Sequence, residues 1–226
     1  MTHPRFKRAR RLAPDQSGTV AVEFALLLPL MLTLFIASMA ITNVVMAYMK
    51  VNAAAQTVAD LIAQQQKTLA DADVQDYSYA ARGVMSPLPT SQVVAGVTTQ
   101  VLKLSYASVV WANGGPAPST AGGDASDANG SWHQEDGGTR ISNASLITAA
   151  NTVCTATTTD ASGNAVTATA DCPNGQSVII VQATYNYPMP FSFVPFQWLS
   201  PMVAGGFNFT ETAITRPRFV SFVRHS

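Results

Sequence analysis

A single long apolar run constrains this sequence more than any other feature. The 26 residues from Phe24 to Met49 contain no charged side chain, and about 20 apolar residues are enough for a helix to cross the hydrocarbon core of a bilayer. Within residues 1–18, five basic residues stand against one acid, Asp15. Because basic flanks stay on the cytoplasmic side of a membrane, we expect a single membrane-spanning helix with a cytoplasmic N-terminus and an exported body.

Four segments are expected from this topology. Residues 19–226 carry eight basic and twelve acidic residues, so the exported part is mildly acidic. A nucleic-acid surface needs clustered Lys and Arg, so we predict no nucleic-acid partner, and membrane topology explains the basic tail better than a nucleic-acid arm does. The expected segments are a basic cytoplasmic leader at 1–18, a transmembrane helix at 19–49, a periplasmic helical stem at 50–90 and a periplasmic α+β domain at 91–226.

A glycine and an acid mark the start of the apolar run. Glu23 follows Gly18 by five residues. A carboxylate in a membrane segment costs about 2.5–3.5 kcal/mol at the bilayer centre and less near an interface, so it needs a partner. Cleavage of the chain after Gly18 would give Thr19 a new α-amine, and that amine, in the same chain or in a neighbour, would supply the partner. Alternatively, Gly18 is only a helix-entry residue and Glu23 lies at headgroup depth, bonded to water.

An ordinary secretory signal is a further alternative for this region. Ser38-Met39-Ala40 has the small-x-small pattern of a signal-peptidase site. The apolar run continues to Met49, however, and this is too long for the apolar region of a signal peptide. A membrane anchor therefore explains the segment better than a removable signal.

Helical patterns are expected within and beyond the span. Pro29 removes one helix hydrogen bond and predicts a kink near residues 25–29, which membrane helices tolerate. Apolar residues recur at helical spacing from Val51 to Leu69, which predicts a stem packed against the soluble domain, with a free-standing coiled coil as the alternative. A second, shorter helix is expected over 74–85, followed by two prolines that stop it.

The two cysteines, Cys154 and Cys172, both lie in the part expected outside the cytoplasm. Two cysteines in an oxidising compartment usually pair. The segment between them has its midpoint at Gly163, in a turn sequence flanked by Thr-rich, strand-favouring runs. We therefore predict a β-hairpin closed at its base by a disulfide, which stabilises by about 3 kcal/mol on the chain-entropy model.

The remainder of the exported part has mostly strand character. The Val- and Thr-rich stretch Gln92–Tyr106 predicts a strand, which residues 109–111 extend or follow, and 141–153 favours a short helix. Val178–Tyr187 is the clearest strand, with Ile179, Val181, Ala183, Tyr185 and Tyr187 on one face and Gln182, Thr184 and Asn186 on the other. Phe207–Ile214 alternates in the same way and is its expected partner. The fold class is therefore α+β: a long helix followed by a small antiparallel sheet domain with a disulfide-closed hairpin.

Two stretches fit neither helix nor central strand. Asn113–Gly130 is rich in Gly, Ala, Ser and Asp, and it contains no lysine for a phosphate-binding loop, so we expect a mobile surface loop. Residues 188–202 are apolar and aromatic with four prolines. One interpretation is a docking surface, either for the bilayer or for another subunit. The other is a crossover connection that folds over the sheet.

Catalytic groups are sparse in this sequence. An enzyme needs convergent acid, base or nucleophile groups. Of the three histidines, His3 is in the tail and His225 is next to the last residue, while His133 lies near Glu135 and Asp136 in a Gly-rich stretch where solvated polar residues are expected. We predict no enzymatic activity, no cofactor and no metal site.

Three blocks of the sequence resemble the TadE/TadG-like family, the bitopic proteins of the tight-adherence machinery that assembles Flp-type type IV pili. The first block, Ser17–Pro29, carries a Gly-x-x-x-x-Glu-Phe spacing similar to that cut by prepilin peptidases. The second is Ala55–Ala63 in the stem. The third comprises Val178–Pro188 and Phe207–Thr215, closing on Arg216-Pro217-Arg218. The chain is too short for the von Willebrand-type domain of TadG-type relatives and lacks their D-x-S-x-S string.

The resemblance implies a minor pseudopilin or a pilus-assembly factor, with cleavage after Gly18 and Glu23 as the pilin-type glutamate. Its expected partners are the inner membrane, other pilin-like subunits, Tad assembly proteins and a prepilin peptidase. The alternative is an unprocessed, signal-anchored periplasmic protein that acts as a scaffold or as a binding module, with the aromatic loop 188–202 capturing a surface, glycan or lipid.

Overall fold

The computed structural model describes residues 17–66, 68–94, 96–119, 129–154, 156–159, 165–168, 172–187, 207–221 and 223–225. These residues belong to two compact units whose boundary lies inside the first helix, between Val44 and Val45. Several expectations lie wholly or partly outside the described residues: the basic leader at 1–18, the centre of the Gly-rich loop at 120–128, the turn around Gly163 and the aromatic segment at 188–202.

Helix α1 is a continuous helix of 47 residues, Ser17–Ala63, and it includes Pro29. It is long and apolar enough, by length and composition, to cross a membrane from Ala21 onward. The apolar side chains of its first part are exposed; for example, Phe24 is 65% exposed and Leu26 is 75% exposed. The expected long apolar helix is thus confirmed, whereas the kink at Pro29 stays a prediction.

From Val45 onward, α1 belongs to the second unit and changes character. One stripe of small and branched apolar residues is buried, with Val51, Ala54, Ala55, Val58, Ile62 and Ala63 fully inaccessible. The intervening Asn52 and Asp60 are half-buried, and Gln56 is exposed. An amphipathic stripe of this kind packs one helix face against a core, and its burial agrees with the packed stem rather than with a free-standing coiled coil.

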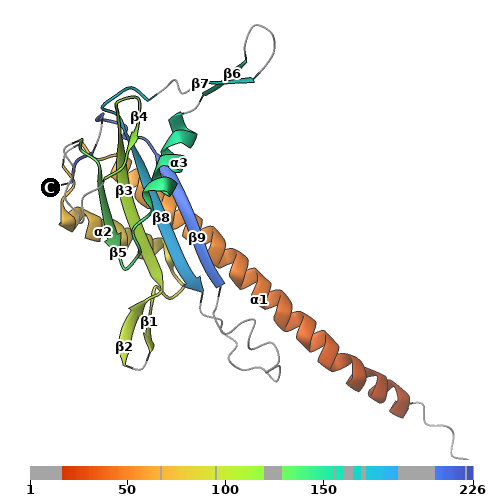
Figure 1. Cartoon of the computed structure of the whole chain (residues 1–226). Helices are drawn as coiled ribbons and strands as arrows, with labels where there is room; N and C mark the ends of the chain where they lie inside the picture. The colour runs from red at the N-terminus through yellow and green to blue at the C-terminus, as the bar shows by residue number, and fades with distance from the viewer. Residues whose placement is uncertain are drawn as a thin grey trace, which may run out of the picture. The chain divides into compact units, whose positions relative to one another are not determined.

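The second unit is built on a five-stranded antiparallel sheet (Figure 1). Two long strands, β3 and β8, lie at its centre, and β9 pairs with β8 from Ile179↔Thr215 to Tyr187↔Phe207. The expected pairing of the two C-terminal strands is therefore confirmed. The strands are β3 (Leu102–Ala112), β4 (Gly115–Ala117), β5 (Trp132–Asp136), β8 (Ser177–Tyr187) and β9 (Phe207–Thr215), in the order β4-β3-β8-β9 with β5 on β3.

The two faces of this sheet are covered by different helices. One face meets the second half of α1 and α2 (Asp71–Met85): Tyr106 of β3 shares a 2.8 Å hydrogen bond with Ser78 of α2, and Tyr48 of α1 packs edge-on against Phe209 of β9. The other face carries α3 (Asn143–Cys154). Figure 1 shows α3 on the opposite side of the sheet from this part of α1.

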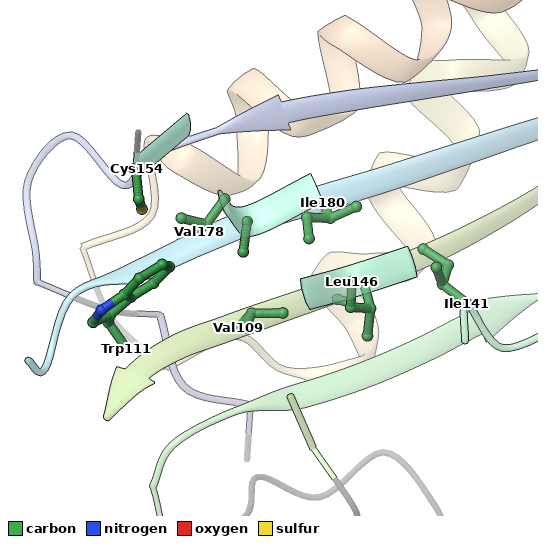
Figure 2. Close-up of a cluster of buried hydrophobic side chains, with 9 residues drawn as sticks. Val109, Trp111, Ile141, Leu146, Cys154, Val178 and Ile180 are labelled. Atoms are coloured by element: carbon green, nitrogen blue, oxygen red, sulfur yellow. The ribbon is translucent and has the colours of Figure 1, made fainter. Parts of the chain in front are cut away.

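Helix α3 covers only half of its face, and this explains the burial pattern of β8. The alternating residues from Ile179 to Tyr187 share one face of the strand, as predicted, and that face is buried against α1 and α2. Val178 and Ile180 are buried as well because they lie beneath α3, whereas Gln182 and Thr184 lie beyond it and are half-buried. Figure 2 shows this core, which comprises Ala107, Val109, Trp111, Ile141, Leu146, Ala150, Cys154, Val178 and Ile180.

Two turns correct the expected arrangement of strands. The predicted strand Gln92–Tyr106 is in fact a short hairpin, β1 (Ser91–Val94) and β2 (Val97–Gln100), followed by β3. Gly96, with φ of +81°, occupies a left-handed conformation in its turn, which glycine adopts without a steric penalty. The stretch thus folds back on itself instead of running on as one strand.

The second correction concerns the start of the expected surface loop. Asn113 and Gly114 have φ of +52° and +81° and join β3 to β4, with Ala112 opposite Gly115. Positive φ at both central residues is the type I′ hairpin turn that Asn-Gly favours. The beginning of this stretch is therefore a tight hairpin, not a mobile loop.

The disulfide between Cys154 and Cys172 is present, with the two Cα atoms 5.4 Å apart. Between the cysteines, β6 (Ala156–Thr159) and β7 (Ala165–Ala168) pair antiparallel. Cys154, however, is the last residue of α3 and not a strand residue, and the turn around Gly163 lies outside the described residues. Closure of the hairpin by the disulfide stays a prediction.

Candidate functional site

The predicted processing site and its acid lie in the first turns of α1. The helix begins at Ser17, so the backbone of Gly18 and Thr19 is already helical. Glu23 follows Thr19 by four residues, about 6 Å along the axis and on the same face. Its side chain is exposed, as are the neighbouring Val22 and Phe24.

This position has electrostatic consequences for Glu23. The first turn of α1 contains no acidic residue, and the first four amides of any helix have no intrahelical acceptor. Glu23 is six residues after Ser17, beyond the first turn to which the effect of the helix dipole is confined, so the helix end itself does little for its carboxylate. An amine at the start of the helix would complement the carboxylate more strongly than the dipole alone. Cleavage after Gly18 itself stays a prediction.

A second feature is an ion pair near the C-terminal end of α1. It joins the stem block Ala55–Ala63 to the Arg216-Pro217-Arg218 segment. Arg218 follows β9, and its guanidinium Nη2 lies 2.9 Å from Asp60 Oδ1. The backbone N–H of Arg218 also donates to the carbonyl of Ala63, at 2.9 Å. Both charged side chains are about half exposed, so the ion pair stabilises by no more than about 1 kcal/mol. Its main effect is to fix where the C-terminal segment meets α1.

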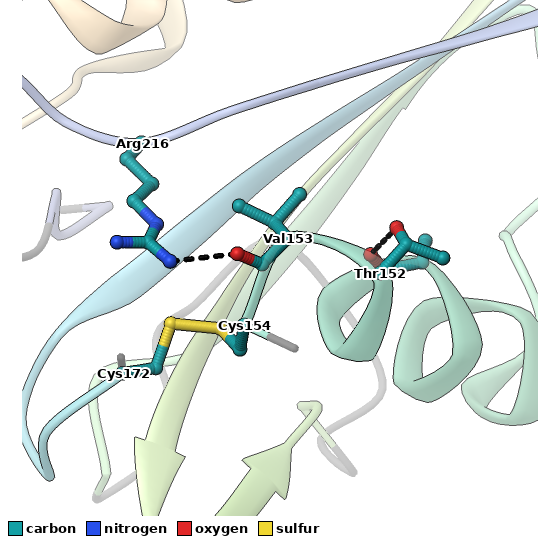
Figure 3. Close-up of a disulfide and its surroundings, with 6 residues drawn as sticks. Thr152, Val153, Cys154, Cys172 and Arg216 are labelled. Atoms are coloured by element: carbon teal, nitrogen blue, oxygen red, sulfur yellow. Dashed lines mark hydrogen bonds between the residues drawn. A yellow bond between two sulfur atoms is a disulfide. The ribbon is translucent and has the colours of Figure 1, made fainter. Parts of the chain in front are cut away.

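Arg216 makes the corresponding contact with α3. Its Nη2 donates to the carbonyl oxygen of Val153 at 2.7 Å, beside the disulfide of Cys154 and Cys172 (Figure 3). A cation near the last carbonyls of a helix satisfies an acceptor that has no partner within the helix and complements the negative end of the dipole. The Arg-Pro-Arg sequence after β9 thus contacts both α1 and α3.

The remaining C-terminal residues pack back on the domain. The amide of Leu69 donates to the carbonyl of Arg224 at 2.7 Å, and the indole N–H of Trp132 donates to the carbonyl of Val223 at 2.7 Å. His225 is buried, with Nε2 3.2 Å from Asp71 Oδ1. These contacts give the last residues a structural role that the sequence analysis did not anticipate.

His133 does not lie in a solvated loop, as its Gly-rich surroundings suggested. It is a residue of β5, pairs with Ala107 of β3 and is 6% exposed. Its Nε2 lies 3.9 Å from Glu135 Oε1, too far for a hydrogen bond. Within the described part of the chain, no group of three or more His, Cys, Asp and Glu side chains is arranged to hold a metal ion.

The strongest pKa shifts belong to buried tyrosines. Burial raises the pKa of Tyr106, whose hydroxyl meets Ser78, above its ordinary value. Burial also raises the pKa of Tyr185 to about 12, and its hydroxyl donates to the carbonyl of Pro89 at 3.0 Å. Both phenols therefore remain neutral hydrogen-bonding groups of the core at physiological pH.

One comparison with known proteins gives a match, and it covers the first part of the chain. Residues 18–60 match the family model of TadE-like protein, in agreement with the resemblance expected from the entry motif and the stem. The matched segment contains Gly18, Glu23 and Asp60. No curated protein and no solved structure gives a significant match. The family is a pilus-associated structural and assembly family, and the match suggests a role in tight-adherence pilus assembly.

Proposed function

We propose, from the match of residues 18–60 to the TadE-like family, that this chain is a non-enzymatic, pilin-like subunit or assembly factor of an Flp-type tight-adherence pilus. A single helix anchors it in the bacterial inner membrane, with the N-terminus in the cytoplasm and the domain that follows Lys50 in the periplasm. Its partners are other pilin-like subunits and Tad assembly proteins, and a prepilin peptidase cuts it after Gly18.

The observation that carries this proposal is an acid on an exposed apolar helix. Glu23 lies between Val22 and Phe24, which are 62% and 65% exposed, at the start of the only candidate span among the described residues. In a bilayer, an ionised carboxylate at this position is costly unless it is paired. A free amine on Thr19 of a neighbouring subunit would relieve the cost, so pairing favours assembly of the helices.

The N-terminus of the mature protein tests the processing step. Peptide mass spectrometry on membranes of the native host should detect a chain that begins at Thr19. In a host that lacks its prepilin peptidase, the same peptide should be replaced by one that retains the leader. A mature chain that begins at Met1 in the wild-type host would reject processing.

Variants of Glu23 test the assembly step. Glu23→Ala and Glu23→Gln should insert in the membrane as well as wild type, but they should lower piliation because neither can pair with an amine. Asp60→Ala is the matched control, since it removes an acid from the same helix at a site where Arg218, not an amine, is the partner. Wild-type piliation in Glu23→Ala would refute the role of the carboxylate.

The second candidate function is an unprocessed scaffold or binding protein held by the same anchor. The contacts of Arg216 and Arg218 with α3 and α1 support it, because they hold the C-terminal segment against the domain within one chain, as a binding module requires. This protein would keep its full-length chain in the inner membrane, and loss of the prepilin peptidase would change neither its size nor its amount.

A further inference from the structure

We propose that one end of the sheet, with Tyr187, Phe207 and Phe209, rests together with the adjoining Tyr48 of α1 in the interfacial layer of the bilayer that α1 crosses. These four side chains are called the aromatic end. The proposal rests on the membrane anchor of the preceding subsection, and it adds a second contact between the protein and the lipid. The occupant of this surface is the boundary between headgroups and acyl chains.

The aromatic end is one continuous set of ring contacts. Phe209 is at its centre: its ring centroid lies 6.2 Å from that of Tyr48, 6.3 Å from that of Phe207 and 6.5 Å from that of Tyr187. Phe207 and Tyr187 face each other across β9 and β8. Because these rings belong to α1 and to two strands, the end of the sheet is attached to one particular level of the helix.

That level is where the apolar run of α1 ends. Tyr48 is followed by Met49 and then by Lys50, the first charged residue after Glu23. The Lys50 ammonium donates to the carbonyl of Val84, at 3.1 Å, and to that of Ser86, so its charge is held by the domain. The membrane boundary of α1 is therefore set at Tyr48 to Lys50, the same level as Phe209.

The aromatic end presents apolar surface at this boundary. Tyr48 and Phe207 are 46% and 45% exposed, Phe209 is half-buried, and the buried Tyr187, 5% exposed, supports them. The exposed side chains continue the apolar surface of the adjoining helix, where Met49 is 58% and Val45 is 48% exposed. Aromatic side chains with one apolar and one polar part concentrate at membrane–water interfaces. Continuity with the lipid-facing surface of α1 identifies the bilayer, rather than a protein, as the occupant.

Quenching of tryptophan fluorescence by brominated lipids tests the proposal. The full-length chain is reconstituted in phosphatidylcholine vesicles that contain lipid brominated either near the headgroup or deep in the acyl chain. Three variants each add one tryptophan at an exposed phenylalanine: Phe35→Trp within the span, Phe207→Trp in the aromatic end and Phe219→Trp as the control. Emission of the wild type in the same vesicles is subtracted for each lipid.

The control is chosen for its distance from the membrane. Phe219 is 62% exposed and follows Arg218, whose amide is bonded to Ala63 at the end of α1. Ala63 is 15 residues beyond Tyr48, which is about 22 Å along a helix. Phe219→Trp should therefore be quenched by neither lipid, although it is more exposed than Phe207, the test position.

The expected result is quenching of Phe207→Trp mainly by the shallow bromines and of Phe35→Trp mainly by the deep ones. Quenching of Phe35→Trp but not of Phe207→Trp would overturn the proposal and still support α1 as the membrane anchor. The same result is expected if a second copy of the chain, and not lipid, covers the aromatic end. Absence of quenching at Phe35→Trp would instead refute the anchor. Equal quenching of Phe207→Trp and Phe219→Trp would also overturn the proposal, because lipid would then reach both positions alike and not the aromatic end in particular.

Discussion

At the scale of single residues, two tyrosines show how a large polar side chain is buried in the core of this domain. Tyr106 and Tyr185 are 1% and 0% exposed, and their hydroxyls meet Ser78 and the Pro89 carbonyl, respectively. A buried hydroxyl without a partner costs about 1–3 kcal/mol, so these bonds are a condition for burying the rings. The same burial links the stability of the domain to alkaline pH.

The domain should lose stability above about pH 10. Burial raises the pKa of Tyr106, and that of Tyr185 to about 12, from an ordinary value of 10.0. Above pH 10, the unfolded chain releases these protons while the folded chain keeps them, so the free energy of unfolding falls as pH rises. Below pH 10 this contribution is fully present. Urea unfolding of the full chain in detergent, at pH 8 to pH 11 in steps, measures the slope.

Tyr185→Phe should flatten that slope, because it removes one of the tyrosines whose pKa is raised by burial. At neutral pH the same variant should lose about 1 kcal/mol with its hydrogen bond to Pro89. Tyr79→Phe is the matched control, since Tyr79 is 63% exposed and should alter neither quantity. An unchanged slope in Tyr185→Phe would show that this tyrosine does not cause the alkaline loss.

At the scale of elements, α3 is held to the sheet by one apolar cluster. Leu146 is 2% exposed within it, whereas the next residue, Ile147, is 37% exposed. Leu146→Ala should lower the free energy of unfolding by about 3 kcal/mol, because it removes buried atoms and leaves a cavity. Ile147→Ala should change it by less than about 0.5 kcal/mol. Urea unfolding followed by tryptophan fluorescence is suitable because Trp111 belongs to the same cluster.

The disulfide joins the end of α3 to the start of the segment before β8. It spans 18 residues, for which chain entropy predicts a stabilisation of about 3 kcal/mol. Cys172→Ala should lose this amount while the buried Cys154 continues to pack in the core, and reducing agent should destabilise the wild type equally. If reduction has no effect on a midpoint measured by thermal unfolding, the cross-link does not stabilise the domain.

The strands and turns also show which local sequence patterns are sufficient to predict an element. The alternation of Val178–Tyr187 was enough to predict the strand, its buried face and its pairing with β9. The hairpin at Asn113–Gly114 carried an equally specific signal, but the Gly- and Ala-rich composition that follows it obscured the turn. The burial of Val178 and Ile180 could not be predicted, because it depends on where α3 lies, and that is decided by long-range packing.

At the scale of the whole molecule, the long apolar helix and the entry motif could be predicted from the sequence, but the long-range contacts of the C-terminal segment could not. The run of uncharged residues and the spacing of Gly18 and Glu23 are local patterns, so they are visible without a structure. The pairing of Asp60 with Arg218 joins residues 158 positions apart, and nothing local in the sequence indicates it. His133 was assigned to a solvated loop for the same reason: β5 is buried only through its pairing with β3.

The orientation of the whole chain leads to a last prediction. If the basic leader keeps the N-terminus in the cytoplasm, the domain enters an oxidising compartment, where Cys154 and Cys172 pair. Replacing Arg5, Lys7, Arg8, Arg10 and Arg11 by glutamine should leave a fraction of the chains inverted, with the domain in the reducing cytoplasm. That fraction should react with a thiol-specific maleimide in the native host, and its electrophoretic mobility should shift.

A control variant must show that the loss of basic residues, and not any change of sequence in the leader, causes the inversion. Asp15→Asn changes the same segment but preserves every basic residue, so its chains should remain fully oxidised and unreactive, like the wild type. Only the glutamine variant therefore changes the number of basic residues beside the span, which is the quantity that the positive-inside rule uses. Fully oxidised cysteines in the glutamine variant would mean that the folding of the exported domain, and not the leader, determines the orientation.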